Sequence, residues 1–289
     1  MTSGAFGVKQ VVGALKEAGV RSGDLVNVYS RLFSLGLPDG APHVSEIPAL
    51  YLKALQEVVG PFGTLVVPTY TTSFGRFGKP FILEESPSEM GKFSEHVRTS
   101  PGSRRSLHPI HSVVALGPLA RELVENHPRW NVGHDTIWER MLRRGGRVVT
   151  LGLRPRQCMT QVHHIEAMAC VPYVYHKVLR GEVWADGRQV VGDFFMSVRY
   201  LEYDIAWDLT RLEKALLQRG ELKRVPLGED AVWSVPMEAV FSACLEGLRQ
   251  DIYYLLEKPP AFVEGRIPTE GISAQRETAP PAGYFEILE

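Results

Sequence analysis

A helix followed by a short apolar strand occurs three times along this chain. The first unit covers residues 8–29, where an amphipathic helix stops at Gly19 and a strand follows at 25–29. The second ends its helix near Gly60 and continues into the strand TLVVP, and the third joins DTIWERMLRRGG to RVVTLGL. This alternation predicts an α/β protein in which layered helices surround a largely parallel or mixed central sheet.

The pattern changes outside these units. Residues 71–87 are rich in glycine and proline and have no clear period, which predicts a long surface loop. A C-terminal hairpin with the turn ADG is expected over 176–200, followed by helices at 205–219 and 235–257.

The chain is expected to form one domain over residues 1–265, in which the hairpin and the last helices are a C-terminal elaboration. The final stretch, 266–289, is polar and rich in proline and glycine, and we expect it to wrap the surface or fray.

The charge of the chain argues against two kinds of partner. It carries 32 basic and 33 acidic side chains, a formal net charge of −1, so no overall field attracts nucleic acid or an anionic membrane. No apolar run reaches the roughly 18 residues that span a bilayer. The start also lacks the pattern of a signal peptide, so we expect a cytoplasmic protein.

The stretch TQVHHIEAMA contains two adjacent histidines and a glutamate. Thr160 is a suitable N-cap for a helix here, which would put His163 and Glu166 on one helical face near the carboxyl edge of the sheet. A carboxylate one turn away can fix the imidazole tautomer and stabilise the imidazolium, which suits a general base. His164 is expected to point elsewhere. The spacing alone also allows a solvated helix start with an incidental histidine–glutamate pair.

A metal site is another use for these histidines. It would need a third ligand beside His163, and His108 or His111 of LHPIH could supply one. The chain contains no HExxH and its spacings match no zinc pattern, so we expect no metal. Cys158 lies in the loop before the helix, which does not favour it as a nucleophile.

Two turns contain groups that suit a phosphate. The first has guanidinium and hydroxyl groups in four consecutive residues, Ser103, Arg104, Arg105 and Ser106. The second follows the strand at 25–29 and contains Ser30, Ser34 and Gly36. An exposed basic turn is the alternative for the first. No Walker A or GxGxxG pattern occurs, so nucleotide hydrolysis and dinucleotide redox chemistry are not expected.

Several stretches resemble, in order, the motifs of the aminoglycoside 3-N-acetyltransferase family, which also contains antibiotic-biosynthesis acyltransferases. They are VNVYSRLFSLG with ALQEVVGPFGTLVVPTY, then RRSLHPIHSVVALG, then GRVVTLGL with TQVHHIEAMACVPY. The most specific parts are R-S-x-H-P-x-x-S and T-x-x-H-x-x-E. The resemblance runs from about residue 8 to about 180 and weakens beyond it.

The resemblance implies a reaction and a set of residues. An acyl group, expected to be acetyl, would pass from coenzyme A to an acceptor amine without a metal or a covalent enzyme intermediate. His163 matches the catalytic histidine, Glu166 its partner carboxylate, and Thr160 the start of that motif. The coenzyme A groove would be lined by Arg105, Ser106, His108 and Ser112. The pantetheine and pyrophosphate would lie against Ser30, Arg31, Leu32 and Ser34.

The chain departs from the family pattern at two places. In the first motif, Tyr29 and Arg31 replace a histidine and a serine, and Arg31 could add a contact to a coenzyme A phosphate or narrow the groove. The segment NVGHDT lacks a serine and a proline that usually precede the following helix. These changes motivate an alternative, a homologue that binds a ligand but has lost catalysis. A metal-dependent hydrolase is the less favoured alternative.

The acceptor is expected to lie against Tyr70, Glu202 and Asp204, in a pocket shaped by residues 175–265. A polycationic aminoglycoside calls for many carboxylates, whereas this region offers few and adds Arg199 and aromatic side chains. A less cationic acceptor, such as an amino sugar on a nucleotide carrier or a related biosynthetic amine, is therefore expected to fit at least as well as an aminoglycoside. A homodimer is possible.

Overall fold

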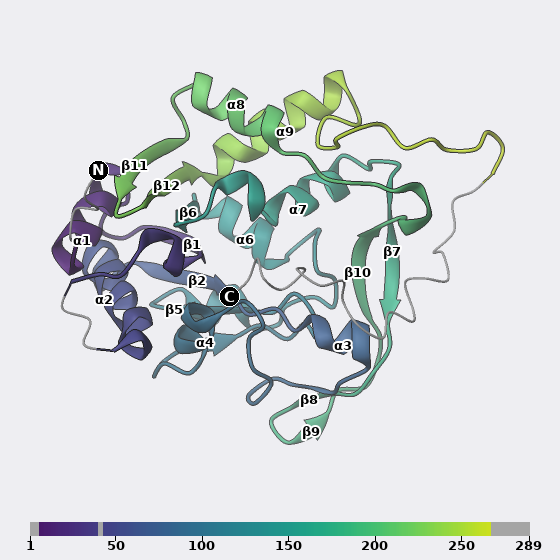
Figure 1. Cartoon of the computed structure of the whole chain (residues 1–289). Helices are drawn as coiled ribbons and strands as arrows, with labels where there is room; N and C mark the ends of the chain where they lie inside the picture. The colour runs from purple at the N-terminus through teal and green to yellow at the C-terminus, as the bar shows by residue number, and fades with distance from the viewer. Residues whose placement is uncertain (1–5, 40–42, 267–289) are drawn as a thin grey trace.

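The computed structural model of the chain describes residues 6–39 and 43–266, and its centre is a seven-stranded mixed sheet (Figure 1). The strand order is β11-β12-β6-β1-β2-β5-β4. The strands β1 (Leu25–Ser30), β2 (Thr64–Pro68) and β6 (Arg147–Leu151) are parallel. The flanking strands pair antiparallel, and they are β4 (Arg104–Arg105), β5 (Val113–Leu116), β11 (Lys223–Leu227) and β12 (Asp230–Pro236). The prediction of layered helices around a mixed sheet is confirmed.

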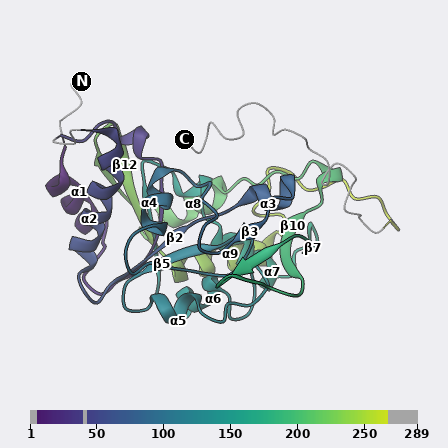
Figure 2. The same cartoon turned by 90° about the horizontal axis from the view of Figure 1, so that it is seen from below.

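Helices cover both faces of this sheet (Figure 2). One face holds α1 (Val8–Glu17), α2 (Ile47–Val59) and α4 (Lys92–Arg98). The other holds α5 (Ala120–Val124), α6 (Ile137–Arg143), α7 (Gln161–Met168), α8 (Thr210–Gln218) and α9 (Met237–Gln250). Strand alternation explains the two cores, because Val26 and Val28 face the first layer while Leu25 and Tyr29 face the second.

The C-terminal hairpin is two hairpins, one inside the other. The outer pair is β7 (Val174–Leu179) with β10 (Phe194–Arg199), and the inner pair is β8 (Val183–Ala185) with β9 (Arg188–Gln189). The ADG turn is confirmed, because Asp186 and Gly187 both have positive φ angles, 51° and 68°, as a two-residue hairpin turn requires.

The segment 71–87 is more ordered than predicted. It contains α3 (Thr72–Phe77) and β3 (Phe81–Ile82), which pairs parallel to β8. Phe74 and Phe81 are buried in a third apolar cluster beneath the hairpin. Their burial against a distant part of the sequence gives this loop its structure.

Both C-terminal helices are shorter than predicted. Residues 207 and 208 pair with 256 and 255 as extended backbone, so the expected start of α8 and the expected end of α9 leave the helices. The Asp208 carboxylate accepts a hydrogen bond from the N–H of Thr210, the first residue of α8. In the predicted tail, residues 267–289 lie outside the described part of the chain.

Four short 3₁₀ helices complete the fold over the described residues. They are η1 (Leu32–Leu35), η2 (Val44–Glu46), η3 (Pro155–Gln157) and η4 (Leu201–Tyr203). None of the helices in the described ranges has the length and apolar character needed to cross a lipid bilayer.

Candidate active site

His163 and Glu166 lie on the first and second turns of α7, which follows β6 through a loop and η3. Their i,i+3 spacing brings the histidine Nδ1 to 2.7 Å from the glutamate Oε2. The glutamate side chain is only 1% exposed, whereas the histidine side chain is 25% exposed. The pair therefore has a buried carboxylate and a ring that solvent or a ligand can reach.

Two aromatic residues bind the other oxygen of the Glu166 carboxylate. The Tyr173 hydroxyl donates to Oε1 at 2.9 Å, and the Trp207 indole N–H donates to the same atom at 2.7 Å. Three donors around a carboxylate require it to act as an acceptor toward each of them. His163 therefore carries its proton on Nδ1, which leaves Nε2 with a free lone pair.

Sequence reasoning missed Tyr173 and Trp207. They are 7 and 41 residues beyond Glu166, and no helical spacing connects them to it. The Trp207 ring also meets the His163 ring edge-on, with 4.7 Å between ring centres. The aromatic character of the region expected to hold the acceptor is the only sequence signal for this role.

The other two residues expected at the start of α7 behave differently. Thr160 precedes the helix, but it has helical backbone angles and its side chain makes no capping hydrogen bond. The prediction that the Thr160 side chain caps this helix is therefore wrong. His164 points elsewhere, as predicted, and its buried Nδ1 accepts from the Gly133 N–H at 3.2 Å.

A cavity of about 150 Å³ lies where β1 and β2 end. Ser30, Arg31 and Thr160 line it together with Tyr29 and Cys158. The cavity thus brings together three predicted site residues from the first and third motifs. The other two first-motif residues, Leu32 and Ser34, lie in η1, which directly follows Arg31 in the sequence.

Tyr29 and Cys158 are held in their neutral forms beside this cavity. Burial raises the pKa of the Tyr29 hydroxyl to about 12, and Asn27 donates to its oxygen at 3.1 Å. Burial also raises the pKa of the Cys158 thiol. The tyrosine is consequently a hydrogen-bond donor at neutral pH, and the cysteine is a poor nucleophile.

Arg105 is partly buried and connects two segments of the chain. Its guanidinium donates to five protein oxygens, on Thr69 (two), Ser112, Leu83 and Ser86. Burial lowers its pKa to about 9. Its N–H groups thus join the end of β2 to the segment after β3, and the alternative of an exposed basic turn does not describe it.

The remaining second-motif residues are completely buried. Ser106 accepts from the Val113 N–H, and Ser112 donates to the Thr69 carbonyl. His108 binds the Phe195 carbonyl through Nε2 and accepts backbone N–H groups at Nδ1, and burial lowers its pKa to about 3. His108 thus contacts the hairpin, the two serines bind backbone groups next to the sheet strands, and none of the three lines the cavity.

The same geometry bears on the metal alternative. Both ring nitrogens of His108 are used by backbone groups, while His111 stacks on Tyr70 and binds Asn131. Within residues 6–39 and 43–266, no group of three or more His, Cys, Asp or Glu side chains is arranged to hold a metal ion.

The expected acceptor residues occupy two places. Tyr70 is 7% exposed, and its hydroxyl has no hydrogen-bond partner among the described residues. Glu202 pairs with Arg266 at 3.2 Å, and Asp204, whose side chain is 90% exposed, pairs with Lys258 at 3.3 Å.

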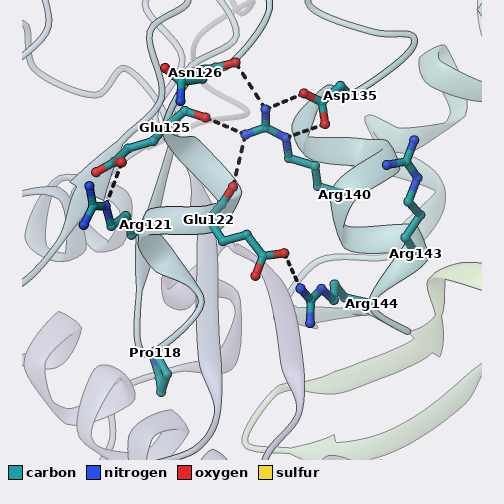
Figure 3. Close-up of a pocket in the computed structure, with 9 residues that line it drawn as sticks. All are labelled: Pro118, Arg121, Glu122, Glu125, Asn126, Asp135, Arg140, Arg143 and Arg144. Atoms are coloured by element: carbon teal, nitrogen blue, oxygen red, sulfur yellow. Dashed lines mark hydrogen bonds and ion pairs between the residues drawn. The ribbon is translucent and has the colours of Figure 1, made fainter.

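A larger hollow of about 710 Å³ lies elsewhere, between α5 and α6 (Figure 3). It is lined by charged side chains that pair with one another, as Arg121 does with Glu125 and Arg144 with Glu122. None of the predicted site residues lines it. Its size therefore does not make it the candidate site.

Comparisons with known proteins agree with the motifs. A family model described as aminoglycoside 3-N-acetyltransferase matches residues 39–249. Aminoglycoside N(3)-acetyltransferase III of Salmonella sp. is 33% identical over 182 residues, 57% of this chain and 61% of that protein. Aminoglycoside N(3)-acetyltransferase VIII of Streptomyces fradiae is 32% identical over 201 residues, 63% of this chain and 68% of that protein. The match thus spans about three fifths of the length of the Salmonella protein.

A solved structure has the same fold. AAC-IIIb in a binary complex with CoASH superposes with a TM-score of 0.71 at 21% sequence identity, covering 88% of this chain and 99% of its own.

Proposed function

The chain belongs to the aminoglycoside 3-N-acetyltransferase family, and from that membership we propose that it transfers an acyl group from coenzyme A to an amine. The acyl group is proposed to be acetyl, and the acceptor to be an aminoglycoside, an amino sugar or a related biosynthetic amine. A cytoplasmic location, where acyl-CoA is available, is part of this proposal. The observation that carries it is the 2.7 Å contact between His163 and Glu166, which leaves one imidazole nitrogen free.

His163 is the proposed general base. With Nδ1–H donated to Glu166, Nε2 accepts the proton that the acceptor amine loses as it attacks. The buried carboxylate then stabilises the imidazolium that forms. Because Tyr173 and Trp207 already satisfy the second carboxylate oxygen, the histidine orientation exists before a ligand binds.

The cavity at the end of β1 supports a coenzyme A site. When bound, acetyl-CoA supplies the acyl group as a thioester. Ser30 and Arg31 are the residues proposed to hold it, and the buried Arg31 Nε has no partner among the described residues. An unsatisfied buried donor beside a cavity fits a polar ligand. The CoASH-bound structure of AAC-IIIb gives the same ligand chemistry for a protein of this fold.

Two variants test the base. His163→Ala removes it, and Glu166→Gln would present an amide N–H to Nδ1, which moves the ring proton onto Nε2. Both should lower kcat for thiol release from acetyl-CoA by about 100-fold or more, with amines as acceptors. Acetyl-CoA should still raise the Tm of both variants and of the wild type, because it binds the folded state.

The outcomes separate the alternatives. Undiminished turnover by His163→Ala would overturn the assignment of the base. A Tm rise with acetyl-CoA but no turnover by the wild type would favour the ligand-binding homologue, which Tyr29 and Arg31 motivate. Failure of acetyl-CoA to change the Tm would count against the whole proposal.

A further inference from the structure

One face of the β7–β10 hairpin ends beside the candidate base. Three cross-strand pairs lie on this face, Phe195–Val178, Ser197–His176 and Arg199–Val174. The Trp130 ring stacks on Phe195, with 4.3 Å between ring centres, and meets His176 edge-on. The face therefore offers aromatic rings at one end and a guanidinium at the other.

The Trp207 ring contacts both Arg199 and the candidate base His163. The Arg199 guanidinium carbon lies 4.9 Å from the centre of the Trp207 ring, and that ring contacts His163. Trp207 also donates to Glu166, so its position is fixed. A ligand whose amine approaches His163 from the hairpin side would have Arg199 within reach of its other groups.

The Arg199 guanidinium packs on the Trp207 ring. Within the described ranges, Arg199 makes no ion pair with a carboxylate, and the three cross-strand pairs include no acidic residue. The acids expected to attract a polycation are already in ion pairs, Glu202 with Arg266 and Asp204 with Lys258. Arg199 is thus the one permanently charged side chain of these three pairs, so this face of the hairpin favours an anionic group.

We infer that Arg199 is a specificity-determining residue that binds an anionic group of the acceptor, a carboxylate or a phosphate, while His163 accepts the amine proton. This inference rests on the proposed function and narrows its substrate class to amines that also carry a negative charge. Coenzyme A is a second source of phosphate, but its proposed holders, Ser30 and Arg31, line a separate cavity that does not include Arg199.

The test uses matched amines with acetyl-CoA as donor. Glucosamine 6-phosphate and glucosamine differ only in the anion, and sisomicin serves as the polycation. For the full chain, kcat/KM for glucosamine 6-phosphate should exceed that for the other two by about tenfold or more, since a hydrogen bond to a charged group strengthens binding by that order. Arg199→Gln should bring the ratio between the two glucosamines close to one, and Arg199→Lys should restore part of it.

Controls separate this inference from the proposed function. Arg188→Gln removes an exposed cation from β9 of the inner hairpin and should keep the wild-type ratio. An equal or higher kcat/KM for sisomicin, or turnover of glucosamine or sisomicin without turnover of the phosphorylated amine, would overturn the inference alone. A change in the KM for acetyl-CoA with Arg199→Gln, at an unchanged ratio, would assign the anion to coenzyme A instead. An unchanged Tm with acetyl-CoA would contradict the proposed function itself, on which this inference rests.

Discussion

Each oxygen of the Glu166 carboxylate has its own partners. Oε2 accepts from His163, whereas Oε1 accepts from Tyr173 and Trp207. The two donors on Oε1 hold the plane of the carboxylate, so they determine where Oε2 points. Both aromatic residues are therefore positioning residues for the proposed base.

Removing one of these donors should lower the rate without unfolding the protein. Trp207→Phe keeps the ring against His163 but removes the N–H, and a carboxylate that is free to turn misplaces the imidazole. We expect kcat to fall about 10- to 100-fold while the KM for acetyl-CoA stays within a few-fold of the wild type. Steady-state kinetics together with thermal denaturation would measure this.

Two comparisons make that expectation specific. Tyr173→Phe removes the other donor and should act in the same direction. Trp184→Phe removes an indole N–H in β8 that donates to the Glu182 carboxylate and to neither His163 nor Glu166. This control should leave kcat unchanged. Equal losses from Trp207→Phe and Trp184→Phe would contradict a positioning role.

Sequence could predict the residues of this site only where the contact is local. His163 and Glu166 are one helical turn apart, so their spacing alone predicts the pair. Tyr173 and Trp207 reach Glu166 only because the β7 and α8 regions fold back over α7, which no local pattern encodes. His108 belongs to a specific motif, yet its contact with the Phe195 carbonyl depends on how the hairpin packs.

The end of β6 is the element whose geometry matters most to the cavity. Gly152 follows this strand with a φ of 65°, and a Cβ there would lie 2.5 Å from the Arg31 carbonyl oxygen and 3.0 Å from Leu35. The backbone of the first motif therefore packs directly against this glycine. Any side chain must push η1 away from the sheet.

Gly152→Ala should consequently destabilise the protein and weaken ligand binding. The left-handed φ costs about 1 kcal/mol for a residue with a Cβ, and the overpacked contact adds about 2 kcal/mol. Gly187→Ala is the matched control, since its φ is 68° but no atom lies within 4 Å of the new Cβ. It should lose only the first contribution, measured as the free energy of unfolding in urea.

The same pair of variants tests the link to the cavity. Gly152→Ala should also reduce the Tm increase that acetyl-CoA produces, whereas Gly187→Ala should not. Equal destabilisation by the two substitutions would show that the close approach to Arg31 has no energetic effect.

Helices and strands were predictable where a periodic pattern stood alone. Three helix–strand units gave three parallel strands, because each strand is a short β-branched run that ends at a turn. The ends of α8 and α9 depend on pairing between residues about 50 positions apart in the sequence, as for Trp207 with Leu256. Propensity favours helix at these positions, and the tertiary pairing overrides it.

The molecule as a whole contains several neutral buried histidines, which makes its stability depend on pH. Burial lowers the pKa of His108 to about 3 and that of His127 to about 4, against about 6.5 in an unfolded chain. Below about pH 6.5, the unfolded state therefore binds protons that the native state does not. The contribution of these histidines to the free energy of unfolding is fully present above that pH, and it is lost as the pH drops toward the native-state pKa values.

We expect the free energy of unfolding to fall between pH 6.5 and 5 by about 1 kcal/mol per pH unit for His108 alone. Urea denaturation at pH 8, 7, 6 and 5 would measure this, and the change from 8 to 7 should be the smallest. His108→Gln, whose amide can still donate to the Phe195 carbonyl, should be less stable at pH 7 but show a shallower decline. Stability that rises on acidification would contradict the neutral assignment.

The apolar clusters on the two faces of the sheet share its strands, and the third lies beneath the hairpin. We propose on this basis that residues 1–265 form one domain, with 175–265 shaping the acceptor pocket.

Trp207 has a consequence for how such an enzyme can change. It supports Glu166 through its N–H and carries Arg199 on its ring, so one side chain serves both the chemistry and the choice of acceptor. Acceptor preference therefore cannot be exchanged as a module. A chimera that imports the hairpin and its following loop from a relative must import an equivalent donor as well, or it will acquire a new pocket above a disoriented base.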